Sequence, residues 1–303
     1  VEEYWNLGDY PEHKIHSIHS YPAKFPAFIE AKAINYAQNK DITINKIADI
    51  FCGCGTVALE AKINNINFWG CDINPVATLI ATVKSNSYNC VTLNMYFNLV
   101  MKRYEDIIVL ESEYDHTNER IKYWFDVEHF IDLKKLITAI DELPNGKYKQ
   151  ALKCIFSSIL KSSSRWLTKS IKPQIDPNKN PINAKKAFVS QFNKYLKILQ
   201  SRNIESKSKI QIETNSFLTK KALPSVSLII TSPPYVTSYE YADLHQLSSL
   251  WLGYTDDYTS LRKGTIGSIH NSESYYFEVM NLNNTGRDIV EKLRSTPSID
   301  NSK

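Results

Sequence analysis

The sequence has little of what marks membrane-spanning, secreted or disulfide-stabilised proteins. No apolar run approaches the roughly 20 residues that a transmembrane helix needs. The chain opens with Val1 and acidic residues and not with a signal peptide, and the start at Val1 indicates that the initiator methionine, or more, is absent. Its five cysteines form no CxxC pair and leave one odd residue, which favours reduced thiols in a cytoplasmic protein over a disulfide framework or a zinc site.

Net charge is also small, but it is unevenly spread along the chain. The formal charge is +4, whereas Asn145 to Ile210 contains 15 Lys and Arg against two acids. Such a basic block suits a polyanion such as nucleic acid, and we take Lys185 and Lys186 within it as candidates for contacts with DNA phosphates. The alternative is a solvated surface in a lysine-rich protein.

Two successive strand–turn–helix patterns lie in the first hundred residues. The first has a strand at 47–51, a glycine turn and a helix from Thr56. The second has a strand that ends at Asp72, a turn at Asn74-Pro75 and another helix. Because successive βα units are typical of parallel sheets, the sequence predicts an α/β fold.

The remainder of the chain is predicted to be mostly helical. Long polar stretches with helical spacing fill 92–208, apart from a loop at 169–183 rich in Pro, Asn and Lys. Strand patterns return near residues 210 and 228. Two further helices are predicted, at 27–39 and 241–254, whereas the final thirty residues are polar and weakly periodic.

The glycine turn is followed by an acid at a spacing that suggests a nucleotide. Gly53 and Gly55 allow a tight turn and a close approach of the backbone to a ligand. Asp72 ends the next strand, about 20 residues on, where nucleotide-binding α/β folds place a carboxylate beside the ribose hydroxyls. The glycines do not fit GxGxxG, and no lysine follows as in a P-loop, so an adenosine-containing ligand is favoured over a phosphate cradle. The alternative is a plain tight turn.

Two consecutive prolines end the last predicted strand. Proline cannot donate to a sheet ladder, so the strand stops before Pro233 and Pro234. In a parallel sheet this end meets the glycine turn, where ligands bind. The stiff backbone and the hydroxyl of Ser232 can offer acceptors to an amino group, and Tyr235 can stack on a flat ring. The alternative is a turn with a core tyrosine.

Three motifs together resemble the amino-group DNA methyltransferases that use S-adenosylmethionine. The segment DIFCGCGT (49–56) is similar to their cofactor motif, with Ile50 where proline is usual. The segment TSPPY (231–235) is similar to their catalytic motif, whose Ser-Pro-Pro-Tyr form is typical of N4-cytosine enzymes, whereas Asp or Asn in first place is typical of N6-adenine enzymes. The segment HSIHSYPAKFPAF (16–28) is similar to the N-terminal motif that helps to hold the methionine end of the cofactor.

The resemblance implies a set of site residues. The cofactor-binding residues would be Tyr21, Pro22, Lys24, Phe25, Asp49, Phe51, Gly53, Gly55, Thr56, Asp72 and Asn215, and the catalytic residues would be Ser232, Pro233, Pro234 and Tyr235. It also implies a Rossmann-like class I sheet built from a cofactor-binding part (1–91) and a catalytic part (209–303). The largely helical, basic insertion between them (92–208) would recognise the target in double-stranded DNA.

Sheets of this family have about seven strands, whereas the sequence provides only four. The residues after LRKGTIGS lack the apolar runs that strands require. A four-stranded sheet would leave one edge and apolar faces open to water. We therefore expect that the C-terminal strands are missing from this chain, and that they lie on a second polypeptide or on a lost C-terminal part.

Three functions stay open at the level of sequence. The first is an N4-cytosine DNA methyltransferase of a restriction-modification or related defence system, and the second is an N6-adenine enzyme. The third is a noncatalytic DNA-binding subunit that keeps the fold. A C5-cytosine enzyme is disfavoured because it needs a nucleophilic cysteine after a proline, and none of the five cysteines follows one.

Overall fold

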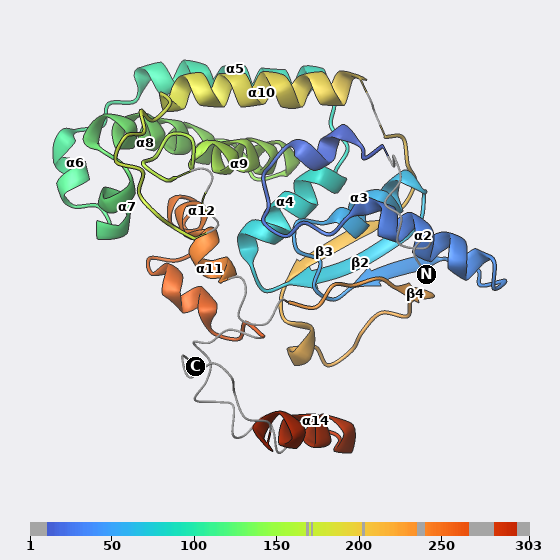
Figure 1. Cartoon of the computed structure of the whole chain (residues 1–303). Coiled ribbons are helices and arrows are strands. Elements are labelled where there is room, and N and C mark those ends of the chain that lie inside the picture. Colours follow the sequence, from blue (N-terminus) through green and yellow to red (C-terminus); the bar gives the residue numbers. More distant parts are fainter. Residues whose placement is uncertain are drawn as a thin grey trace.

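A four-stranded parallel sheet forms the centre of a mixed α/β structure, consistent with a Rossmann-like methyltransferase fold (Figure 1). The computed structural model describes residues 11–167, 170, 172–201, 204–234, 240–266 and 282–295. The strands are β1 (Lys46–Asp49), β2 (Asn67–Asp72), β3 (Ile210–Thr214) and β4 (Leu228–Ile229). All four lie where the sequence predicts them, in the order β3-β2-β1-β4.

The register of the sheet brings its functional ends together. Ile47 of β1 pairs with Phe68 of β2 on one side and with Leu228 of β4 on the other. Since every pairing is parallel, all the carboxyl ends lie at one edge of the sheet. The glycine turn after β1 and the prolines after β4 therefore become neighbours.

Helices cover one face of the sheet, and the other face is covered only in part within the described residues. One face packs Ile47 and Phe68 against the helices α2 (Ala27–Gln38) and α3 (Thr56–Ile63). On the other face Trp69 is only 3% exposed, because Phe217 and Val226 pack there and the Lys220 ammonium lies 4.8 Å from its ring centroid. Ile229 of the edge strand β4 is 58% exposed, however, so the expected open apolar surface is found there, whereas the segment with Phe217 and Val226 covers the sheet at Trp69.

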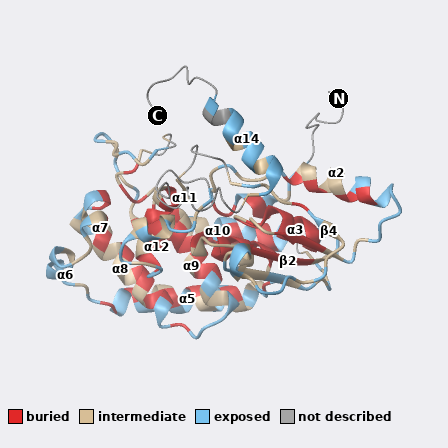
Figure 2. Cartoon of the chain, turned by 90° about the horizontal axis from the view of Figure 1, so that it is seen from below, coloured by how far each residue is buried: buried red, intermediate tan, exposed pale blue. Residues whose placement is uncertain are grey.

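A helical part joins β2 to β3, as the sequence predicts. Its helices are α4 (Pro75–Ser85), α5 (Cys90–Asp106), α6 (Glu111–Asp115), α7 (Glu119–Trp124), α8 (Val127–Asp141), α9 (Lys147–Ile159) and α10 (Ala184–Ser201). They share a large aromatic-rich core in which the rings of Phe97 and Phe192 stack 3.8 Å apart and those of Trp124 and Trp166 stack 4.6 Å apart. Buried positions accordingly gather on the inner faces of these helices (Figure 2).

The segment after the prolines contains α11 (Tyr241–Leu244), α12 (Gln246–Trp251), the 3-10 helix η3 (Tyr258–Arg262) and α14 (Asn284–Ser295). The predicted helical stretch over 241–254 is confirmed for 241–251, except that a break at His245 (φ −105°, ψ 8°) divides it into two short helices. His245 is buried there, and its Nδ1 lies 2.7 Å from the side-chain amide of Asn74. The helix α14 within the polar final segment was not predicted.

Helices α5 and α10 lie on one side of the helical part, whereas α11 lies on the opposite side (Figure 1). Strand β4 is at an edge of the sheet that the described residues form, so the expectation of further strands remains a prediction. None of the helices in the described part of the chain combines the length and apolar character that crossing a bilayer requires.

Candidate functional site

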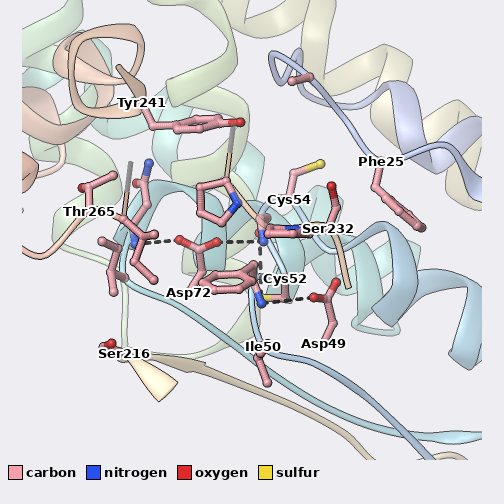
Figure 3. A pocket seen from close by; sticks show the side chains of 18 of the residues that line it. Phe25, Asp49, Ile50, Cys52, Cys54, Asp72, Ser216, Ser232, Tyr241 and Thr265 are labelled. Carbon is pink, nitrogen blue, oxygen red and sulfur yellow. Dashed lines mark hydrogen bonds between the residues drawn. The ribbon is translucent and has the colours of Figure 1, made fainter. Parts of the chain in front are cut away.

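A pocket lies at the carboxyl edge of the sheet, and it collects most of the residues predicted from the sequence. The predicted residues that line it are Tyr21, Lys24, Phe25, Asp49, Phe51, Gly53, Thr56, Asp72, Asn215, Ser232, Pro233 and Pro234. Figure 3 shows Asp72 near the middle of the lining side chains, with Asp49 and Ser232 on one side and Thr265 on the other. The motifs after β1, β2 and β4 therefore share one cavity.

The two glycines of the turn have different roles. Gly53 (φ +46°) lines the pocket, and its N–H donates to Asp72 Oδ2 at 2.9 Å. Gly55 (φ +73°) caps α3 and does not line the pocket, because it faces Ala81 of α4. A Cβ atom at Gly55 would lie 2.5 Å from the Cβ of Ala81, so this glycine is required for close helix packing.

Replacing Gly55 by alanine is expected to destabilise the fold more than the same replacement at another glycine with a similar φ. Gly253 is the matched control, because its φ of +70° is similar and a Cβ there would meet nothing within 4 Å. Overpacking should make Gly55→Ala about 1 to 3 kcal/mol more destabilising than Gly253→Ala, measured by urea unfolding. Equal free energies of unfolding for the two variants would show that α4 shifts without cost.

Asp72 has the geometry of a receptor for two hydroxyl groups. Its Oδ1 accepts from the N–H of Asn74 and its Oδ2 from the N–H of Gly53, both at 2.9 Å. Each oxygen of an ionised carboxylate keeps a further lone-pair site, so two more donors can bind. Burial raises the pKa of Asp72, although its backbone hydrogen bonds act in the opposite direction. A donor-rich ligand at this position would stabilise the ionised form.

Asp49 connects the cofactor motif with the catalytic motif. It is buried at the end of β1, and its Oδ1 accepts from the Thr231 hydroxyl at 2.7 Å and from the Phe51 N–H at 3.1 Å. Burial raises the pKa of Asp49 to about 7, and these two hydrogen bonds lower it. Thr231 directly precedes Ser232, so this contact fixes the start of the proline segment against the pocket floor.

The N-terminus of α3 provides a place for an anion inside the pocket. Thr56 is the first residue of this helix and lines the cavity. Its Oγ1 is buried and has no hydrogen-bond partner among the described residues. A helix N-terminus favours negative charge, so a ligand carboxylate would satisfy both the hydroxyl and the backbone N–H groups.

Aromatic side chains provide the apolar walls. The rings of Phe51 and Phe217 meet edge to face with centroids 5.2 Å apart. On the other wall, the ring centroid of Tyr21 lies 6.3 Å from that of Tyr241 and 5.0 Å from that of His245. Burial lowers the pKa of His245 to about 3, so this ring is neutral at physiological pH and acts as a packing group behind Tyr21. Such walls suit a flat heterocycle.

The proline segment contains carbonyl acceptors to which the described part of the chain does not donate. Ser232, Pro233 and Pro234 follow β4 and line the pocket. No described residue donates a hydrogen bond to the carbonyl groups of Ser232 and Pro233. Tyr235, the fourth member of the predicted catalytic motif, lies outside the described residues.

Several predicted residues are not at the pocket. Pro22 does not line it, and neither does Gly55. Lys185 and Lys186 lie on α10, where Lys185 pairs with Glu105 of α5 and Lys186 is exposed. These helices are on the side of the helical part opposite to α11, so the two lysines are not brought to the pocket (Figure 1). Their contact with DNA phosphates remains a prediction.

Some of the residues that line the pocket were not predicted as site residues from the sequence. These lining residues include Asn74, Ser216, Phe217, Tyr241, Leu261, Gly264 and Thr265. Asn74 carried a detectable signal, because an Asn-Pro pair at a helix start predicts a cap, and its Oδ1 indeed accepts from the Val76 N–H at 3.0 Å. The residues at 261–266 carried no local signal.

Fold and site together define an α/β protein with a pocket that is lined by the acid at the end of β2 and by the proline segment after β4. No family model matches the chain. The chain is similar to the type II methyltransferase M.MvaI of Kocuria varians, with 24% identity over 272 residues. The alignment covers 82% of this chain and 60% of that relative, so the chain spans about 60% of the relative's length. This similarity supports the resemblance to methyltransferases drawn from the motifs.

Proposed function

We propose that this chain is a DNA methyltransferase that transfers a methyl group from S-adenosylmethionine to N4 of cytosine. One observation carries the proposal: Asp72 and Gly53 line the same pocket as Ser232, Pro233 and Pro234. The similarity to a type II methyltransferase supports the general activity and a role in DNA modification. The serine at the head of the proline segment supports cytosine over adenine.

The residues of the pocket fit the parts of this cofactor. The open lone pairs of Asp72 suit the two ribose hydroxyls, and the N-terminus of α3 with Thr56 suits the carboxylate. The aromatic walls suit the adenine ring. When bound, S-adenosylmethionine supplies an electrophilic methyl group.

The proline segment would prepare the amino group of the target base. This amino group is a poor nucleophile, because its lone pair is delocalised into the ring. The acceptors at Ser232 and Pro233 would bind its two hydrogens, draw the nitrogen toward tetrahedral geometry and localise the lone pair. The proton released after transfer can leave to water, so no general base is required. The base reaches this position only when it is rotated out of the duplex.

The decisive experiment is methyl transfer from labelled S-adenosylmethionine to double-stranded DNA, followed by nucleoside analysis. The proposal predicts labelled N4-methylcytosine. Labelled N6-methyladenine alone would contradict the base assignment and favour the adenine alternative. DNA binding without any label would favour the noncatalytic subunit.

Removing the ring of Tyr235 is expected to slow methyl transfer by roughly 5- to 150-fold, because base–aromatic stacking contributes about 1 to 3 kcal/mol. Cofactor affinity, measured by calorimetry, should stay near the wild-type value in Tyr235→Ala. Tyr36→Ala is a suitable control, since Tyr36 is 57% exposed on α2 and outside the pocket. Equal transfer rates for wild type and Tyr235→Ala would rule out the stacking role.

A further inference from the structure

A groove lies between the helical part and the segment after the catalytic motif. We call it the α7–η3 groove; it is lined by Asn118, Glu119, Arg120, Tyr123, Leu250, Asp256, Asp257 and Tyr258. The Asn118 side-chain amide donates to the carbonyl oxygen of Asp256 at 2.7 Å and ties the two walls together. The groove is therefore built from both parts of the chain.

Arg120 is held rigidly in this groove. Its Nε donates to Oε1 of Gln246 at 2.5 Å, and the same oxygen accepts from the Trp124 indole at 2.9 Å. Gln246 is fully buried, so the anchor is fixed from within the core. The guanidinium carbon lies 4.7 Å from the ring centroid of Tyr123 and 5.4 Å from that of Tyr258.

The end of the Arg120 side chain remains available to a ligand. Its two Nη groups donate to no described residue, and they are not among the buried unpartnered atoms. An arginine that is anchored through Nε and flanked by rings presents these two groups as a fork of fixed orientation. Such a fork matches a pair of neighbouring acceptors.

The groove is joined to the pocket through η3. Tyr258 and Leu261 belong to this short helix; Tyr258 lines the groove and Leu261 lines the pocket. Arg262 fixes the helix to α11, because its Nη2 and Nε donate to Asp243 Oδ1 at 2.7 and 3.0 Å. A ligand in the groove would thus lie next to a ligand in the pocket.

The charges of the groove favour the edges of bases over phosphates. Asp256 and Asp257 line the groove beside Arg120 and would repel a phosphate, whereas the charge of Glu119 is partly balanced by Lys122 at 2.7 Å. An arginine fork is the commonest partner for O6 and N7 of guanine, and a carboxylate can accept from the amino group of cytosine. The mixture of one fork with acids therefore suits a base pair.

Several basic side chains of the block have partners of their own within the described part of the fold or on its surface. Lys149 and Lys153 bind Asp141, and Lys185 forms an ion pair with Glu105. Lys179 donates to the carbonyl oxygens of Lys161 and Trp166, and Arg165 donates to those of Lys122 and Tyr123. The face that carries the pocket is thus better equipped to read bases than the face formed by α5 and α10.

We propose that the α7–η3 groove reads a base pair next to the target base, with the Arg120 fork bound to a guanine. This inference rests on the proposed function, since it takes DNA as the substrate. It assigns a determinant of sequence specificity to a position that no sequence motif marks.

The test compares the sequences methylated by wild type, Arg120→Gln and Arg120→Lys. Genomic DNA is treated with each enzyme and S-adenosylmethionine, methylated positions are mapped by sequencing, and rates are then measured on oligonucleotides with each base at the positions around the target. Wild type should require guanine at one of these positions. Both variants should lose roughly 5- to 150-fold of this discrimination, because lysine keeps the charge but has no fork.

Arg103→Gln is the matched control, since Arg103 forms an exposed ion pair with Glu142 on the α5 side; it should leave the sequence preference unchanged. The salt dependence of DNA binding should not change in Arg120→Gln, as expected for a base contact. Unaltered guanine preference in both variants, or a flatter salt slope in Arg120→Gln that Arg120→Lys restores, would overturn the inference. A wild-type chain that methylates no DNA would instead overturn the proposed function, and the inference with it.

Discussion

Replacing Asp72 with alanine is expected to weaken the binding of S-adenosylmethionine by about 10- to 150-fold. A hydrogen bond to a charged group contributes roughly 1.5 to 3 kcal/mol, which corresponds to this range of affinity. The variant removes the open acceptors and also releases the N–H groups of Gly53 and Asn74, which donate to this carboxylate. The variant would therefore remove the charge of Asp72 and also the hydrogen bond that fixes the position of the glycine turn.

Isothermal titration calorimetry of the purified chain with S-adenosylmethionine measures this effect directly. Glu213→Ala is the matched control, because Glu213 is a carboxylate on the neighbouring strand β3 that lies outside the pocket and pairs with Lys220 at 2.5 Å. Its removal should leave the affinity unchanged. If Asp72→Ala binds the cofactor as tightly as wild type, the carboxylate does not hold the ribose.

Replacing Glu30 with glutamine is expected to stabilise the protein progressively as the pH rises above neutrality. Glu30 is fully buried on α2, and neither carboxylate oxygen has a partner among the described residues. Burial, together with the nearby charges of Glu60 and Asp49, raises its pKa to about 10. The native protein therefore holds a neutral acid at this position at pH 7.

The direction follows from proton binding. Because the pKa of Glu30 is raised in the folded state, its contribution to stability is complete below its unfolded pKa of about 4.3 and is lost as the pH rises toward 10. The loss is about 1.4 kcal/mol per pH unit within that window. Burial lowers the pKa of Lys62 and of Lys161 to about 8, and these two groups act in the opposite direction above pH 8.

Comparison with the neutral variant isolates Glu30 from the lysines. The difference in the free energy of unfolding between Glu30→Gln and wild type should grow by about 2.7 kcal/mol from pH 7 to pH 9, as measured by urea denaturation. Since both proteins contain Lys62 and Lys161, their effect cancels in this difference. Parallel pH profiles would mean that Glu30 is already ionised in the native state.

The parts of the site that could be predicted from the sequence are those with a local cause. Asp72 is the last residue of β2, and the glycine turn and the prolines come shortly after β1 and β4. Parallel pairing alone brings these strand ends to one edge. The positions of the four strands could also be predicted, because each strand is marked by a short apolar run in the sequence.

The rest depends on contacts between distant segments. Helical spacing over 241–254 gave no sign of the break at His245, because that break is fixed by Asn74 and Tyr21 from other parts of the chain. The basic block likewise suggested a surface that binds nucleic acid. Charge counted along a sequence does not reveal that Arg165 and Lys179 donate to carbonyl groups within the fold.

The order of strands in the sheet also has a consequence for how the chain folds. Contacts between β1 and β2 are short in sequence, as in the hydrogen bond from Gly53 to Asp72 across 19 residues. The contacts that add β3 and β4 span 142 and 182 residues, as in the bonds from Lys209 to Asn67 and from Asn45 to Ser227. Closing such long loops costs more entropy and slows folding. We therefore expect the part of the pocket around the glycine turn and Asp72 to assemble first. The proline segment should join it last, after the helical part has shortened the loop between them.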